Sequence, residues 1–398
     1  MRRAAIVSPL RTPVGRFGGA LKDLPVEGLG AILVNALLER TRLDPALVED
    51  VVFAQSYANS ETPCVGRWIA LEAGLPIGVP GMQIDRRCGG GLQSVVTAAM
   101  MVQTGACDAV IAGGVESMSN IEHYTTGVRW GTRSGSPILY DRLDRGRERS
   151  QPVQRFGHIS GMIETAENLS RKYAISREAA DSYAARSHKR AADAWADGRM
   201  AAEVVPVSVP MKRGEAIVVT QDEGVRADTT AESLARLRPI QPDGTVTAGN
   251  VAQQNDAAAV CLVVAEDRLD ALGVTPDAFL VGWAAAGCEP AEMGIGPVPA
   301  TEKLMRRIGL SVADMDLIEI NEAFACQVLA VLQSWRGVDE QRVNVNGSGI
   351  SLGHPIGATG VRILTTLVHE MKRRGARYGL ETMCVGGGQG VAAVFERA

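Results

Sequence analysis

The sequence predicts an α/β protein whose sheet is largely buried. Short apolar runs alternate with helical patterns over residues 1–119, and the same alternation resumes over residues 270–398. Such alternation is typical of β/α units, in which helices cover the faces of a sheet. Residues 120–248 differ, because an arginine-rich stretch is followed there by a helix-rich one. We therefore expect this middle part to be inserted between the strands of one larger sheet.

These changes of texture divide the chain into three expected domains. Residues 1–119 together with 249–269 form the N-terminal half, 120–248 form an inserted loop domain on the side that binds the ligand, and 270–398 form the C-terminal half. Buried strands are expected at apolar runs, which we place at 4–9, 50–55, 106–114, 257–265 and 315–320.

Helices are expected where apolar residues recur at helical spacing. Residues 92–104 carry Leu92, Val95 and Val96 on one face, and Gly105 follows as a C-cap. Another helix is expected to begin after Ser176, which would cap the backbone N–H of Ala179.

The two halves share a pattern of elements. Each contains a glycine-rich turn, a helix, a single glycine and a strand; the helices are 92–104 in the first half and 361–374 in the second. Two similar halves facing each other would bring both glycine-rich turns to one cleft. A duplication and a chance likeness both fit a pattern of this length.

Composition excludes several classes of protein. The net charge of −4 argues against general binding to nucleic acid or to membrane surfaces. Seven cysteines without a C-x-x-C pair favour neither a zinc site nor a disulfide framework, so no metal is expected. The N-terminal apolar run is too short for a signal peptide, and no run approaches 18 apolar residues. A reduced, cytoplasmic protein is expected.

Cys88 is the first candidate for chemistry. It precedes three glycines at the junction between a strand and the helix 92–104. Unpaired N–H groups and the helix dipole at such a junction are expected to lower the pKa of the thiol and favour the nucleophilic thiolate. The alternative is a small buried hydrophobe at a tight turn, and a nucleophile would still need a base.

Three further residues lie in unusual surroundings. His354 is flanked by five glycines within 347–360, which favours a functional imidazole over a structural one. Cys384 ends a strand before a glycine run whose N–H groups could form an oxyanion hole; the G-x-G-x-x-G spacing of a dinucleotide loop is absent. Asn321 and Glu322 end an apolar strand and are either caps or functional residues.

The motifs that carry these residues resemble the thiolase family, which comprises acetyl-CoA acetyltransferases and 3-ketoacyl-CoA thiolases. The sequence has CGGGLQS, NEAFA, GHPIGATG and CVGGGQG in that order, with RTPVGRFGGAL, AGGVESMS, TAENLS and GTVTAGN elsewhere, so the likeness covers nearly the whole chain. The resemblance implies a thiolase fold, with two pseudo-symmetric α/β/α/β/α halves and an inserted loop domain.

The resemblance also implies an activity. A thiolase cleaves a 3-ketoacyl-CoA reversibly to acetyl-CoA and a shortened acyl-CoA, or condenses acetyl-CoA to acetoacetyl-CoA, through an acyl-cysteine. Coenzyme A would be a co-substrate with no cofactor bound permanently, and acyl-CoA would be the partner, with no nucleic acid and no membrane. A homo-oligomer, dimer or tetramer, acting in fatty acid metabolism such as β-oxidation is expected.

Residue roles follow from the same resemblance. Cys88 matches the nucleophile, His354 its base, Cys384 the acid/base that moves the α-proton, and Asn321 the residue that holds a water in an oxyanion hole. The backbone N–H groups of Cys88 and Gly386 match a second oxyanion hole. The matched CoA and substrate positions are Arg226 (adenine), Ser233 (nucleotide), Ala252 (near the pantetheine), Ala323 and Phe324 (pantetheine and pocket wall), and Met162.

Some positions depart from the family pattern. Ala252 stands where Ser is usual near the pantetheine, and Ala257 stands where Gly is usual. Gly161 stands where short-chain biosynthetic members have His, and Asp85 where Asn is common. None removes a catalytic residue, so they bear on the choice of substrate, which the sequence leaves open.

Two other functions are set against this one. A decarboxylating condensing enzyme shares the fold but is expected to lack the second cysteine, so Cys384 argues against it. A non-catalytic CoA- or lipid-binding protein would not need all four catalytic positions. The seven arginines within 127–157 are either a solvated or subunit-contacting surface or a site for the phosphates of CoA.

Overall fold

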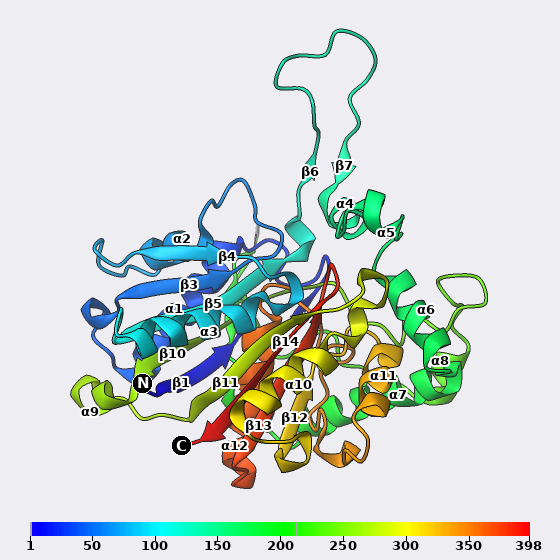
Figure 1. The fold of residues 1–398 in the computed structure, drawn as a ribbon. Helices are drawn as coiled ribbons and strands as arrows, with labels where there is room; N and C mark the ends of the chain where they lie inside the picture. The colour runs from blue at the N-terminus through cyan, green and yellow to red at the C-terminus, as the bar shows by residue number, and fades with distance from the viewer. Residues whose placement is uncertain (1, 212–213) are drawn as a thin grey trace.

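The strands form one large mixed sheet. The computed structural model describes residues 2–211 and 214–398. In this part the sheet order is β12-β13-β14-β11-β1-β10-β5-β3-β4, and β2 pairs with β10 (Figure 1). The strands are β1 (Ala4–Arg11), β2 (Gly15–Arg16), β3 (Asp50–Ala54), β4 (Gly81–Ile84), β5 (Ala109–Ser117), β10 (Asn255–Ala265), β11 (Ala278–Gly287), β12 (Leu317–Ile320), β13 (Tyr378–Val385) and β14 (Gln389–Arg397).

The strand order is symmetric about its centre. There β1 and β11 run antiparallel through the pairs Ala5↔Phe279 and Ile6↔Ala278. On one side β10, β5 and β3 follow, and on the other β14, β13 and β12; in both series the successive pairings are antiparallel, antiparallel and parallel. The repeated pattern of the sequence is therefore a duplicated fold.

Helices lie on both sides of each half of the sheet. The central layer holds α3 (Gly90–Thr104) and α12 (Thr359–Arg374), which pack on strands of both halves. The outer layers hold α1 (Val26–Thr41) and α2 (Val65–Glu72) over the N-terminal half and α10 (Pro297–Ile308) and α11 (Ala325–Ser334) over the C-terminal half. The two halves together thus form the five layers: an outer helix layer, the sheet of one half, the central helices, the sheet of the other half and a second outer helix layer.

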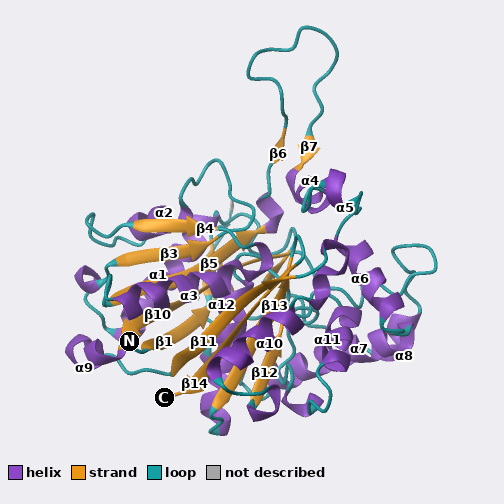
Figure 2. Cartoon of the chain, viewed as in Figure 1, coloured by secondary structure: helices purple, strands orange, loops and turns teal. Residues whose placement is uncertain are grey.

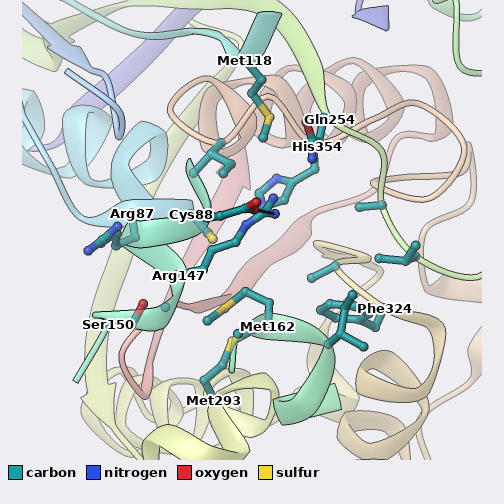
Figure 3. Close-up of a pocket in the computed structure, with 18 of the residues that line it drawn as sticks. Arg87, Cys88, Met118, Arg147, Ser150, Met162, Gln254, Met293, Phe324 and His354 are labelled. Carbon is teal, nitrogen blue, oxygen red and sulfur yellow. Dashed lines mark hydrogen bonds and ion pairs between the residues drawn. The ribbon is translucent and has the colours of Figure 1, made fainter. Parts of the chain in front are cut away.

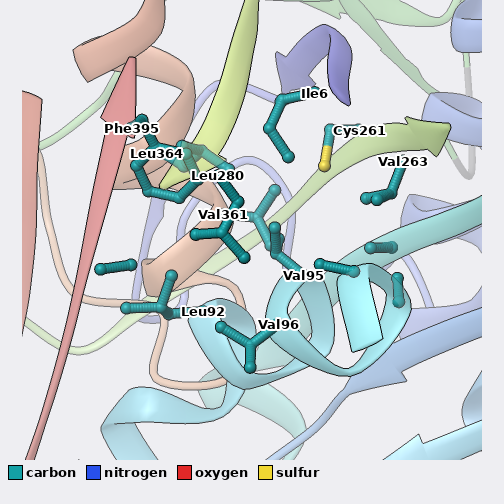
Figure 4. Packing of buried hydrophobic residues seen from close by; sticks show 14 of the residues in the cluster. Ile6, Leu92, Val95, Val96, Cys261, Val263, Leu280, Val361, Leu364 and Phe395 are labelled. Carbon is teal, nitrogen blue, oxygen red and sulfur yellow. The ribbon is translucent and has the colours of Figure 1, made fainter. Parts of the chain in front are cut away.

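Most residues of the two central helices are buried, and Figure 4 shows Leu92 of α3 and Val361 of α12 packed in the same apolar cluster. The expected helix 92–104 begins two residues earlier, at Gly90, and ends as predicted at Gly105, whose φ is 76°. The burial of α12 includes polar side chains, since Arg362, Thr365 and Glu370 are buried along with its apolar residues. None of the helices in the described residues is both long and apolar enough to span a membrane.

The middle part of the chain lies beside the sheet and above it. The elements there are β6 (His123–Tyr124), β7 (Tyr140–Asp141), α4 (Arg142–Glu148), α5 (Val153–Phe156), α6 (Met162–Lys172), α7 (Arg177–Ala196), β8 (Val207–Val209), β9 (Ile217–Val219) and α8 (Ala231–Ala235), and α9 (Leu269–Leu272) follows β10. The loop between β6 and β7 projects far from the body of the molecule (Figures 1 and 2).

Local capping explains two helices of this part. Ser176 Oγ accepts the N–H of Ala179 at 3.2 Å, so the predicted cap of α7 is confirmed. The arginine-rich stretch also contains a helix, because the Asp141 carboxylate accepts the N–H of Leu143 at 2.8 Å and starts α4. An N-terminal Asp cap of this kind satisfies backbone donors that a short helix would otherwise leave open.

The central helices cross where both have glycine. A Cβ placed on Gly91 of α3 would lie 2.9 Å from the backbone N of Gly360, and one placed on Gly360 would overlap the backbone N of Leu92. Such distances leave no room for any side chain. The N-terminal turns of α3 and α12 therefore touch backbone to backbone, which brings the segments just before them to one place.

We predict that Gly360→Ala destabilises the protein by at least about 2 kcal/mol, because the added methyl must push two helix backbones apart. Thermal unfolding of both variants measures the effect. Gly28→Ala in α1 is the matched control: its Cβ would meet Pro25 Cγ at an ordinary 3.5 Å, so the stability should stay the same or rise. Equal melting temperatures for Gly360→Ala and wild type would contradict the close crossing.

Candidate active site

A cavity of about 520 Å³ opens where the two halves and the middle part meet. Seven of the residues predicted for the site line it, namely Cys88, Met162, Ala252, Ala323, Phe324, His354 and Gly386. In Figure 3, Cys88, His354 and Arg147 lie together on one side, and Met162, Met293 and Phe324 lie on the other. The cavity therefore has a polar and an apolar wall.

Cys88 lies in a 3-10 turn, Arg87–Gly89, between β4 and α3, as the sequence predicts. Hydrogen bonds fix this turn from both sides: the Asp85 carboxylate accepts the N–H of Arg87 at 2.6 Å, and Ser56 Oγ donates to the carbonyl of Arg87 at 2.9 Å. The half-buried Cys88 side chain packs against a small apolar cluster that includes Tyr57 and Met118.

The predicted lowering of the pKa of Cys88 is wrong. Burial raises the pKa of the thiol above its ordinary value, although the N–H of Gly386 and the charges of Arg87 and Arg147 act in the opposite direction. The loss of hydration of the thiolate outweighs the backbone donors at the helix N-terminus. Cys88 is therefore a neutral thiol in the unliganded site.

His354 precedes α12 and is buried, with 8% of its surface exposed. Its backbone N–H donates to Asn255 Oδ1 at 2.9 Å. The Thr359 hydroxyl donates to the carbonyl of Pro355, so its oxygen accepts the Nδ1–H of His354 at 2.6 Å. This pairing assigns the proton to Nδ1 and makes Nε2 the acceptor of the ring, which Asn321 Nδ2 approaches at 3.4 Å.

The charge state of His354 follows from its surroundings. Burial lowers the pKa of the imidazole to about 3, and the positive charges of Arg362 and Arg147 act in the same direction. At neutral pH the ring is therefore uncharged. A neutral imidazole next to a neutral thiol can take up a proton from it.

Asn321 and Cys384 lie behind the wall of the cavity. Asn321 follows β12, is fully buried, and has its Nδ2 3.4 Å from His354 Nε2; its Oδ1 has no hydrogen-bond partner among the described residues. Cys384 is fully buried near the end of β13, and it packs with Ala323 and Phe324, which line the cavity. Burial raises the pKa of Cys384 well above its ordinary value, and the nearby Cys88 adds to the rise.

Two carboxylates anchor the loops of the site. Glu116 in β5 is fully buried and accepts the N–H groups of Ser56 (3.0 Å), Tyr57 (3.3 Å) and Gly357 (2.9 Å). Burial raises the pKa of Glu116 to about 7. Sequence reasoning missed this residue, although a Glu inside the apolar run of 109–117 was a signal that could have found it.

Glu322 plays the same part in the C-terminal half. Its carboxylate accepts from Tyr183 Oη at 3.0 Å, Ser187 Oγ at 2.6 Å, Asn344 Nδ2 at 3.1 Å and the N–H of Ile350 at 3.1 Å. Of the two readings of the sequence, a structural anchor is the one that these contacts support, since Glu322 does not line the cavity.

Other predicted residues lie away from the cavity. Arg226 is exposed and donates its backbone N–H to His188 Nδ1 at 3.3 Å, and Ser233 is exposed in the capping box of α8 with Thr230. Gly161 lines the cavity, whereas the nearby His158 is exposed. The described residues contain no group of three or more His, Cys, Asp or Glu side chains that could hold a metal ion.

Arg147 of α4 is a charged lining residue that sequence reasoning did not single out. The stretch 127–157 holds seven arginines, and its pattern offers no means of choosing among them. Arg142 pairs with Glu122 at 2.7 Å and Arg145 with Glu148 at 3.3 Å, whereas Arg129 and Arg133 are exposed on the projecting loop.

Comparisons with known proteins agree over the full chain. Residues 4–267 match the model of the thiolase N-terminal domain, and residues 274–397 match that of the thiolase C-terminal domain. The chain is 44% identical to the acetyl-CoA acetyltransferase of Chromobacterium violaceum over 99% of both chains. It is 43% identical to the acetyl-CoA acetyltransferase of Pseudomonas aeruginosa over the whole of both.

Solved structures agree as well. The crystal structure of the Bacillus anthracis acetyl-CoA acetyltransferase superposes with a TM-score of 0.95 at 41% identity, covering 100% of this chain and 99% of that one. The human mitochondrial 3-ketoacyl-CoA thiolase gives a TM-score of 0.94 at 38% identity with the same coverage. The chain therefore belongs to the thiolase family and is an acyltransferase that acts on CoA thioesters.

Proposed function

We propose that the chain cleaves a 3-ketoacyl-CoA reversibly to acetyl-CoA and a shortened acyl-CoA through an acyl group on Cys88. In the cleavage direction Sγ bonds to C3 of the substrate, and the C2–C3 bond breaks. The electron pair of that bond leaves with acetyl-CoA as its enolate, which takes a proton at C2. The thiol of a second CoA then displaces the acyl group from Cys88. The observation that carries this proposal is a neutral thiol and a neutral imidazole facing one cavity.

His354 is the base in this scheme. Because the pKa of Cys88 is raised by burial, the thiol does not ionise unaided and needs an acceptor for its proton. Nε2 of His354 is that acceptor, since Nδ1 is occupied by Thr359. Deprotonation by a positioned base is worth roughly 10²–10⁴ in rate.

The developing negative charges are assigned to two groups of donors. The N–H groups of Cys88 and Gly386 face the Cys88 thiol and would hold the oxyanion formed at C3, each at a value of roughly 3 kcal/mol. Asn321, together with His354, would hold a water or the thioester oxygen of the enolate. The unpartnered Oδ1 of the buried Asn321 supports the bound water, because an amide oxygen accepts a hydrogen bond and a water can donate one.

Cys384 is assigned the proton transfer at C2. Its raised pKa makes it a neutral thiol, which can donate a proton to the enolate carbon. Met162, Ala252, Ala323 and Phe324 would line the path of the pantetheine arm. Arg226 and Ser233, both exposed at the surface, would meet the adenine nucleotide.

We further place the enzyme in the cytoplasm and in fatty acid metabolism such as β-oxidation, with coenzyme A as a co-substrate and not as a resident cofactor. All seven cysteines are free in the described chain, which suits a reducing compartment. The preferred acyl chain length and the physiological direction are to be measured with a thiolysis series on substrates of increasing length.

The chain is also proposed to form a homo-oligomer, a dimer or a tetramer. The loop that projects between β6 and β7 carries large apolar side chains in water: Trp130 is 92% exposed, Ile138 61% and Leu139 67%. Large apolar side chains exposed on a projecting arm favour burial against another surface. A second copy of the chain supplies that surface in this proposal.

Within the proposed function, the first prediction concerns the base. Alkylation of Cys88 by iodoacetamide should rise with pH from 6 to 9, by about tenfold for each unit below its pKa, because the thiolate is the reacting form. His354→Ala should slow labelling at pH 7 by roughly a hundredfold. Peptide mass spectrometry separates Cys88 from the exposed Cys64, and acetyl-CoA should block the label only at Cys88. A rate that is flat with pH, or unchanged in His354→Ala, contradicts the assignment.

The second prediction separates the two cysteines and tests the proposed function. Cys384→Ser should still form an acetyl-enzyme at Cys88 on brief exposure to acetyl-CoA, seen as an added mass on the intact protein. Its thiolysis should fall by roughly 10²–10⁴, because a hydroxyl is a poor proton carrier at neutral pH. Cys88→Ser should carry no stable thioester at all. Near-normal turnover of Cys384→Ser would reduce that residue to part of the pocket wall and reopen the condensing-enzyme alternative.

The third prediction concerns assembly. Sedimentation should give a wild-type mass of two or four times the 42.1 kDa of one chain. Trp130→Glu combined with Leu139→Glu should lower that mass, because charges on the arm oppose its burial. Val218→Glu on β9, where Val218 is 61% exposed, is the matched control and should leave the mass unchanged. A wild-type protein that sediments as a single chain would rule out the oligomer.

A further inference from the structure

Arg147 is the cation that reaches the reactive end of the cavity. It lies in the last turn of α4, lines the cavity with Cys88 and His354, and lies beside them in Figure 3. Its ion pair within the chain is with Asp144 at 3.3 Å, and the Asp144 side chain is 71% exposed. An exposed pair of this kind holds an arginine weakly. The guanidinium is therefore available to a ligand.

The space that Arg147 occupies is open because residue 161 is glycine. A Cβ placed on Gly161 would lie 3.8 Å from Arg147 Cβ, so a larger side chain there would point into the room beside Arg147. Gly161 has a φ of 148°, a conformation that residues with a side chain rarely adopt. The backbone at 161 thus keeps this corner of the cavity clear.

A second cation, Arg87, lies beneath the same helix. A Cβ on Gly146 of α4 would lie 3.6 Å from Arg87 Nη1, and no carboxylate in the described chain is within ion-pairing distance of Arg87. The two carboxylates that line the cavity, Asp144 and Glu148, are paired with arginines of their own helix. At Cys88 itself the charges that act are positive, because Arg87 and Arg147 both lower the pKa of its thiol, and we call this end of the cavity the cationic corner.

The phosphates of CoA do not account for this charge. In a CoA thioester they lie at the far end of the pantetheine arm from the sulfur, whereas Arg87 and Arg147 act directly on the Cys88 thiol. The wall opposite, with Met162, Met293 and Phe324, is apolar and suits the pantetheine arm and aliphatic carbons. What remains for the cationic corner is the acyl group.

We propose that the preferred substrate is a 3-ketoacyl-CoA whose acyl chain carries a carboxylate, and that Arg147 binds this carboxylate, with Arg87 adding to the field. The proposal rests on the function proposed above and names its substrate class. A guanidinium binds a carboxylate through two parallel hydrogen bonds, which fixes the position of the chain as well as its charge. Arg147 is thus a specificity-determining residue, distinct from the groups that make and break bonds.

The test compares two six-carbon 3-ketoacyl-CoA thioesters, one ending in a methyl group and one in a carboxylate. Wild type should favour the carboxylated substrate in kcat/KM by at least about tenfold. Arg147→Leu should lose roughly ten- to hundredfold on that substrate and keep or improve its rate on the methyl-ended one. Arg147→Lys, which keeps the charge without the planar fork, should fall between them.

Arg145→Leu is the matched control, because Arg145 lies on the same helix, pairs with Glu148 and does not line the cavity. It should leave the preference unchanged. An equal loss on both substrates in Arg147→Leu, together with slower alkylation of Cys88, would overturn the proposal and make Arg147 a stabiliser of the thiolate. A rise in KM for CoA alone would overturn it in favour of a CoA contact. Absence of thiolysis with every substrate would instead overturn the proposed function itself.

Discussion

The close crossing of α3 and α12 at Gly91 and Gly360 is the constraint on which the site depends. Both helices are buried between the two halves of the sheet, so neither can move aside without opening the central layer. Because their first turns touch backbone to backbone, the segment before each one ends at the same place. Those segments carry Cys88 and His354. A contact between the backbones of two helices, with no side chain between them, thus sets the separation of the Cys88 thiol and the His354 imidazole.

Burial then determines the protonation states of Cys88 and His354. The helix N-terminus, the N–H of Gly386 and two arginines all favour a thiolate, yet the removal of Cys88 from water outweighs them. The same removal lowers the pKa of His354 to about 3. At neutral pH the Cys88 thiol alone would be inert as a nucleophile, and the uncharged His354 imidazole alone would be inert as an acid. Together they form a pair in which one proton can pass from sulfur to nitrogen once substrate arrives.

Much of this could be predicted from sequence, because it depends on local pattern. The strand at 257–265, the helix 92–104 and the cap of α7 follow from periodicity and from the residues at helix ends. The meeting of Cys88 and His354 follows from the repeat, since like junctions in two facing halves must converge. These features need no knowledge of which distant segments pack on them.

The parts that sequence missed are those set by distant segments. Cys88 loses its water to Leu143 and Ile356, which lie 55 or more residues away, so its pKa could not be inferred from its own neighbours. Arg147 enters the cavity only because Asp141 starts a short helix in a stretch with no apolar period. A motif gives the residue type at a position, whereas hydration depends on what covers it.

Carboxylates complete the arrangement by holding loops that no strand or helix holds. The segment 346–358, which lies between α11 and α12, has almost no regular structure, so its backbone donors need other partners. Glu116 of the N-terminal half binds Gly357 of the C-terminal half together with Ser56 and Tyr57, and Glu322 binds Ile350 together with α7. Each carboxylate thus joins segments that are far apart in the chain. A loop fixed at both ends in this way presents His354 in one orientation before any substrate binds, which is the condition for fast proton transfer.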